Sequence, residues 1–273
     1  MAKKEGFELS LYPASVAPDL SGGLPSGELR LLQKDIQTRF PDLHPSLKRN
    51  PWAYPLLDRL SFMPKDLDSS LRVGEIARRV LSGYEDRHPE IAIPQQTRDG
   101  IVLGSLLSDI GRADDDPEKM HEVYSAGIRW RDDPNAWQWT YVQAHPGRSS
   151  DLVVVAGRGT DSLEALIPRY HHGLKWKYPY TAVGAAPIET LPPEVQFGIY
   201  VAAAADVADA VTRNVKGEGR AYLDDDEFAG RDWVSVVTDE IAVDHEIAEL
   251  AVLSTLQVKG VIDQSRVVFS HSA

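Results

Sequence analysis

The chain contains no cysteine. This absence excludes disulfide bonds, thiolate catalysis and zinc sites built on cysteine ligands. A metal ion bound by this protein must therefore use histidine, aspartate or glutamate side chains.

Two further shortages narrow the class of protein. No segment approaches the roughly 18 consecutive apolar residues of a membrane-spanning helix, and the N-terminal stretch lacks the apolar core of a signal peptide. Basic residues are also outnumbered, with 29 Lys and Arg against 41 Asp and Glu, which gives a net charge of -12. We therefore expect a cytoplasmic protein that has no membrane partner and no broad nucleic-acid-binding surface. The negative net charge does not exclude a local site that binds a small anion.

The remaining composition is that of a globular chain, with 42% hydrophobic and 26% charged residues over 273 positions. Apolar residues recur at helical spacing in several segments, and these predict an all-α fold. The run at 152–156, LVVVA, fits either a strand or a buried helical turn. We expect an irregular arm with an accessory helix over 1–66 and a helical domain over 67–273. Helices are predicted near 26–40, 71–84, 94–109, 136–144, 163–172, 195–212 and 244–255.

Three histidines follow apolar segments, namely His145 and the adjacent pair His171 and His172. Two adjacent side chains cannot both point into one face of a helix, so the pair needs another explanation. Neutral imidazoles together with carboxylates suit iron, manganese or zinc. The alternative is that one histidine lies in a loop while the other packs against Trp176 or Tyr178.

Five segments decide between these interpretations through their order along the chain. Together they resemble the HD-domain phosphohydrolases and, among these, the HD-GYP subfamily. That family has a His-Ser-x-Arg-Val segment, then Leu-His-Asp-Ile-Gly-Lys, His-Pro, a His-His pair before Gly-Tyr-Pro, and Val-Ala-Asp-x-x-Asp-Ala-Leu-Thr. The matching segments are SSLRVGEIA (69–77), LLSDIG (106–111), WQWTYVQAHP (137–146), RYHHGLKWKYP (169–179) and AADVADAVT (204–212).

The resemblance implies a helical bundle whose inward side chains bind two or three metal ions. These ions activate a water molecule that attacks a phosphodiester, commonly cyclic di-GMP. His121 offers an alternative match to the His-Pro histidine, but the aromatic residues before His145 fit the family better. The second aspartate of the last segment, Asp209, matches a residue with a structural role in the family. The resemblance assigns metal ligation to Asp109, His145, His171, His172 and Asp206, catalysis to Asp109 and Arg112, and phosphate binding to Arg112, Lys175, Lys177 and Tyr178. Taken alone, Lys175 and Lys177 are equally consistent with solvated surface lysines.

The departures from the family pattern fall on one side of the expected metal centre. Ser69 stands where the family has its first histidine, and Ser108 stands where it has the histidine of the His-Asp pair. Arg112 replaces a lysine, which keeps the positive charge but removes a proton donor.

The sequence therefore predicts a degenerate HD-GYP-like domain that binds fewer divalent ions than its family and a cyclic dinucleotide or another phosphate ligand, with weak or no phosphodiesterase activity. The alternatives are an active phosphohydrolase with an incomplete metal site and a non-catalytic module that binds a protein partner.

Overall fold

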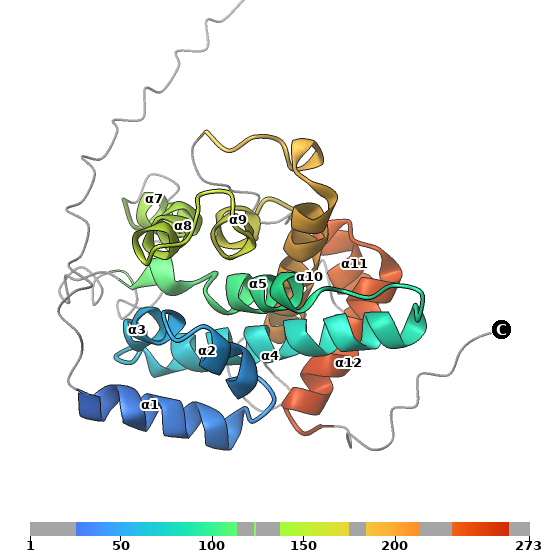
Figure 1. Cartoon of the computed structure of the whole chain (residues 1–273). Coiled ribbons are helices and arrows are strands. Elements are labelled where there is room, and N and C mark those ends of the chain that lie inside the picture. Colours follow the sequence, from blue (N-terminus) through green and yellow to red (C-terminus); the bar gives the residue numbers. More distant parts are fainter. Residues whose placement is uncertain (1–25, 114–122, 124–136, 175–183, 213–230, 262–273) are drawn as a thin grey trace, which may run out of the picture.

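A computed structural model describes residues 26–113, 123, 137–174, 184–212 and 231–261. Within these ranges every regular element is a helix and no strand occurs, which confirms the all-α prediction (Figure 1). The elements in chain order are α1 (Ser26–Arg39), α2 (His44–Arg49), α3 (Ala53–Asp58), α4 (Pro64–Arg87), α5 (Gln95–Leu106), η1 (Ile110–Arg112), α7 (Trp137–Gln143), α8 (His145–Val155), α9 (Leu163–Tyr170), η3 (Ile188–Thr190), α10 (Pro193–Val211), α11 (Trp233–Ile241) and α12 (His245–Val258).

The ambiguous run at 152–156 lies mostly in a helix, because it forms the last turns of α8. Periodicity predicted only part of α4, and it missed α2, α3 and α11. The segment before α4 contains prolines, which argued against helices there. Pro45 and Pro55 lie in the first turns of α2 and α3, where the missing N–H group breaks no helical hydrogen bond.

The long helix α4 lies at the centre of the bundle, where it packs against α5, α10 and α12 (Figure 1). Its apolar face, with Leu71, Ile76 and Val80, is fully buried. Gly74 permits the close approach of α5, because a Cβ atom at this position would lie 3.0 Å from Cβ of Leu106. The alanine-rich helix α10 is similarly buried against its neighbours, and α5 also supports α9.

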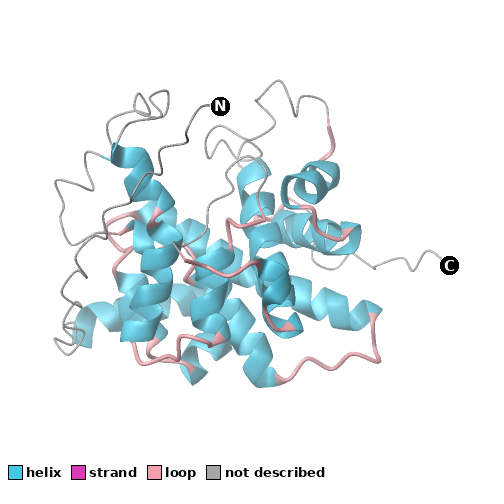
Figure 2. Ribbon diagram, turned by 90° about the horizontal axis from the view of Figure 1, so that it is seen from above, coloured by secondary structure: helices cyan, strands magenta, loops and turns pink. Residues whose placement is uncertain are grey.

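One connected group of buried apolar side chains runs through the fold, from Leu32 on α1 to Leu250 on α12. The boundary expected between residues 66 and 67 falls within the first turn of α4. The division into an N-terminal part and a helical domain stays a prediction. Figure 2 shows the same helical packing from above. Among the described helices, none is long and apolar enough to cross a lipid bilayer.

Candidate metal centre

Four of the predicted ligands lie together inside the fold. Asp109, His145, His171 and His172 each offer one ligand atom, and these four atoms all lie within 4.8 Å of one another. The three histidines are at most 5% exposed, and Asp109 is 8% exposed. Residues from three separate sequence segments therefore form one buried cluster of nitrogen and oxygen ligands.

Each ligand lies at an end of a helix. Asp109 follows α5 and directly precedes the short helix η1, while His145 is the first residue of α8. His171 follows the last residue of α9, and His172 is next to it. Because α8 packs against both α9 and η1, the three helix ends meet at one place.

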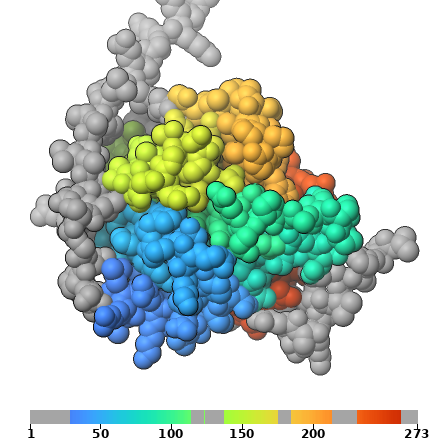
Figure 3. Space-filling model, viewed as in Figure 1, coloured from blue at the N-terminus to red at the C-terminus, as the bar shows by residue number. Residues whose placement is uncertain are grey.

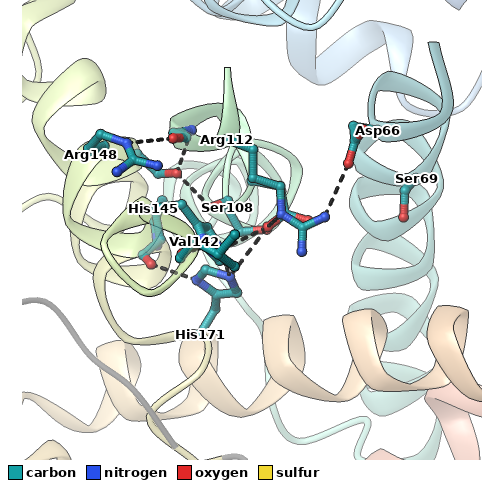
Figure 4. A network of polar contacts seen from close by, with 12 residues as sticks. Asp66, Ser69, Ser108, Arg112, Val142, His145, Arg148 and His171 are labelled. Carbon is teal, nitrogen blue, oxygen red and sulfur yellow. Dashed lines mark hydrogen bonds and ion pairs between the residues drawn. The ribbon is translucent and has the colours of Figure 1, made fainter. Parts of the chain in front are cut away.

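A glycine and a serine hold the Asp109 loop against α8. A Cβ atom on Gly111 would lie 2.4 Å from the carbonyl oxygen of His145 and 2.5 Å from the amide nitrogen of Ser149, so only glycine fits. The Ser149 hydroxyl accepts from the Gly111 N–H at 2.8 Å and donates to the Ser108 carbonyl at 2.6 Å. Arg148 donates to the Gly111 carbonyl at 2.7 Å (Figure 4).

Backbone carbonyls orient two of the imidazole rings. Nδ1 of His145 lies 2.6 Å from the Val142 carbonyl oxygen, and Nδ1 of His171 lies 2.6 Å from that of Pro168. A carbonyl oxygen only accepts, so both Nδ1 atoms carry the proton and both Nε2 atoms present a lone pair. The usual helical partner of the Val142 carbonyl would be the N–H of residue 146. That residue is Pro146, which has none, so the carbonyl is left for the histidine.

The two Nε2 atoms point at each other and at the aspartate. They are 3.2 Å apart, and Oδ1 of Asp109 lies 3.0 Å from Nε2 of His145 and 3.7 Å from Nε2 of His171. Lone pairs at such distances repel unless a cation lies between them. Neighbouring ligands of an ion with bonds near 2.05 Å are separated by about 2.9 Å in octahedral and about 3.3 Å in tetrahedral geometry. The separations of 3.0 and 3.2 Å match these values and only the 3.7 Å separation is longer, so the three atoms can converge on one divalent ion.

The protonation states favour metal binding. Burial lowers the pKa of His145 to about 4, so the ring is neutral near pH 7. Burial alone would raise the pKa of Asp109, but the positive charge of Arg112 opposes this effect and helps to hold the pKa well below its ordinary value. Near neutral pH the cluster thus offers neutral imidazole nitrogen and ionised carboxylate, the forms that bind metal.

Arg112 lies beside the cluster on its more exposed side. Its Nε is 3.1 Å from Oδ1 of Asp109, and its Nη1 donates to Oδ1 of Asp66 at 3.1 Å (Figure 4). The Arg112 side chain is 26% exposed. Asp66 was not among the predicted site residues. It lies three residues before Ser69 on α4, so Asp66 and Ser69 lie on one helical face.

Among the described residues, the other predicted site residues do not belong to this cluster. Asp206 is a described residue but does not belong to the cluster of four. Its neighbour Asp209 is fully buried and accepts hydrogen bonds from Ser69 and from both nitrogens of a bidentate Arg72. Ser108 donates its hydroxyl to a backbone carbonyl of α5. The residues predicted to bind phosphate, Lys175, Lys177 and Tyr178, and the alternatives His121 and Trp176, lie outside the described residues.

Comparisons of the chain with protein-family models, with curated proteins and with solved structures found no match. The geometry of the site is therefore the evidence for function.

Proposed function

We propose that this chain is an HD-GYP-like helical domain that binds one divalent metal ion of the iron, manganese or zinc class, and that its ligand is a cyclic dinucleotide or another phosphate compound. Phosphodiester hydrolysis is weak or absent. The observation that carries the proposal is the convergence of two Nε2 lone pairs and the Asp109 carboxylate at 3.0 to 3.7 Å.

The chemistry of the donors supports this choice of ions. Three imidazoles and one carboxylate form a borderline set that suits iron, manganese or zinc better than the all-oxygen sites of calcium or magnesium. A bound ion of this class supplies Lewis acidity and lowers the pKa of a coordinated water molecule. Arg112, at the exposed edge, supplies a fixed positive charge for an anionic ligand but donates a proton poorly.

Weak hydrolysis follows from the residues around a second metal position. The family's two missing histidines correspond to Ser69 and Ser108, and both hydroxyls already donate to other groups of the fold. Arg112 also pairs with Asp109 and Asp66, so its guanidinium group supplies a positive charge on this side of Asp109. These contacts favour one bound ion over two.

Metal analysis of the purified full chain tests the proposal. We expect about one equivalent of metal per chain. His171→Ala should remove it, whereas His245→Ala, which deletes an exposed histidine at the start of α12, should retain it. Metal binding would be refuted by two results together. The purified chain would contain no metal, and His171→Ala would leave the binding of added Mn(II), Fe(II) and Zn(II) unchanged. Two equivalents would instead support an intact bimetal centre.

A hydrolysis screen separates binding from catalysis. The metal-loaded chain is incubated with cyclic di-GMP and with bis(p-nitrophenyl) phosphate, with His171→Ala as the control. Turnover no greater than that of the control supports the proposed binder. Turnover that depends on His171 supports the active phosphohydrolase, which retains a metal ligand set able to activate water.

A further inference from the structure

A second polar site lies away from the candidate metal centre, between the N-terminal helices. A cavity of about 420 Å³ opens there, lined by residues of α1, α2 and α3 and of the segment between α2 and α3. None of the lining residues belongs to the metal cluster. In Figure 1 the helices α1, α2 and α3 form one corner of the bundle, and in Figure 3 these N-terminal helices lie in the blue region of the visible face.

The cavity is positively charged in a protein whose net charge is -12. Arg30 and Lys34 from α1 and Lys48 from α2 line it, and none of the described lining residues is acidic. Arg30 and Lys34 are four residues apart, so they lie on the same face of α1. Three like charges around one cavity repel one another, and a multivalent anion between them would remove that repulsion.

Two acidic residues that are close to these cations in the sequence pair with other side chains. Asp35 on α1 pairs with Arg39, and Asp42, which follows α1, pairs with Arg78 on α4. Within the described part of the chain, Arg30, Lys34 and Lys48 make no ion pair. Their charges are therefore available to a ligand.

Neutral polar groups complete the cavity. Tyr54 is 3% exposed, and its hydroxyl lies 3.3 Å from Nδ1 of His44, so the wall formed by these two rings is fixed by packing and by a hydrogen bond. Gln33 and Gln37 occupy the same face of α1 as the two cations and add amide groups. The volume lies within the range of about 300–1,000 Å³ that is usual for small-molecule sites.

We propose that this cavity binds a small anion with two or more phosphate groups, held by Arg30, Lys34 and Lys48. One phosphate can contact the α1 pair while the next contacts Lys48 of α2. Amide and imidazole groups then supply hydrogen bonds to phosphate oxygens or to hydroxyl groups of the ligand. The site does not depend on the metal centre.

Calorimetric titration of the full chain with inorganic pyrophosphate tests this site. The protein is first treated with EDTA, so that phosphate cannot bind through a metal ion. We expect pyrophosphate to bind about tenfold more tightly than orthophosphate at low ionic strength, and binding to weaken as salt is added. Equal affinities for the two anions, or no binding of pyrophosphate, would overturn the proposal.

Matched substitutions locate the bound anion. Lys34→Gln should weaken pyrophosphate binding about three- to tenfold, and the triple variant Arg30→Gln, Lys34→Gln, Lys48→Gln should abolish it. Lys65→Gln removes the same single charge from another exposed position, at the start of α4, and should change the affinity less than about twofold. If Lys65→Gln has the effect of Lys34→Gln, the binding is a general charge effect and the site is refuted.

A last variant separates this site from the metal centre. His171→Ala should leave pyrophosphate binding by the EDTA-treated chain unchanged. Loss of binding in this variant would assign the anion to the metal cluster and refute the cavity. Because the titration uses metal-free protein, a failure of the proposed metal function leaves its result unaffected.

Discussion

Ser149→Ala removes a hydroxyl that joins the Asp109 loop to α8. Ser149 is fully buried, and its Oγ accepts from the Gly111 N–H at 2.8 Å and donates to the Ser108 carbonyl at 2.6 Å. The alanine variant leaves both backbone groups inside the protein without this partner. We expect it to lower the free energy of unfolding and, separately, the affinity for metal.

The size of both effects follows from these two hydrogen bonds. A buried polar group that loses its partner costs about 1–3 kcal/mol, so two such groups predict a loss of about 2–6 kcal/mol in the free energy of unfolding. Removing a group that positions a metal ligand commonly weakens metal binding by about 10- to 100-fold. Asp109, between the two anchored backbone groups, is the ligand that would shift.

Ser105→Ala provides the matched control. Ser105 is also fully buried, but its hydroxyl only donates to the Ile101 carbonyl four residues earlier on α5. Its removal should cost at most about 1 kcal/mol and leave metal affinity unchanged. Urea unfolding of the metal-free proteins measures the first effect, and titration with Zn(II) the second. Equal metal affinities for Ser149→Ala and Ser105→Ala would refute the positioning role of Ser149.

Three further predictions concern the same centre. Gly111→Ala places a Cβ against two backbone atoms and should cost about 1–3 kcal/mol or more in urea unfolding, with loss of stoichiometric metal binding. Pro146→Ala restores an N–H that competes for the Val142 carbonyl, and it should weaken Zn(II) binding about tenfold, as measured by titration. In metal-free protein the pKa of His145 is about 4 in the folded state and 6.5 in the unfolded state. Between pH 6.5 and pH 4 the unfolded chain therefore binds a proton that the folded chain does not, and the free energy of unfolding falls as the pH is lowered. This predicts a loss of about 2 kcal/mol between pH 7 and pH 4.5 that His145→Asn should lack, and an equal loss in both proteins would contradict it.

Periodicity predicted the main helices because the buried faces of α4 and α10 are apolar over several turns. It missed α2 and α3, which are one to two turns long and whose stability comes from packing of residues such as Leu47 and Leu57 against the rest of the core. The helical state of 152–156 likewise depends on tertiary context, since a short apolar run fits strand and helix equally well.

The site was partly predictable. Ordered motifs indicated Asp109, His145, His171 and His172, and the structure brings these four together. Periodicity gave no reason to single out Asp66 or Ser149, because a lone acidic or hydroxyl residue on a helix is usually a surface or helix-end feature. Their importance comes from contacts between segments far apart in the chain, and such contacts leave no local pattern.

The contacts on the two sides of Asp109 support the proposal of a single bound ion. On one side, helix-end carbonyls hold the rings of His145 and His171 in the tautomer that binds metal. On the other side, Ser69 joins a buried network in which Asp209 also contacts Arg72 and Lys259. A histidine at 69 would have to leave this network to reach a metal ion, and the buried Asp209 would lose one of its hydrogen bonds. Under the proposed HD-GYP-like arrangement, a second ion therefore requires more than histidines at positions 69 and 108, because the contacts that hold α4, α10 and the end of α12 together would change as well.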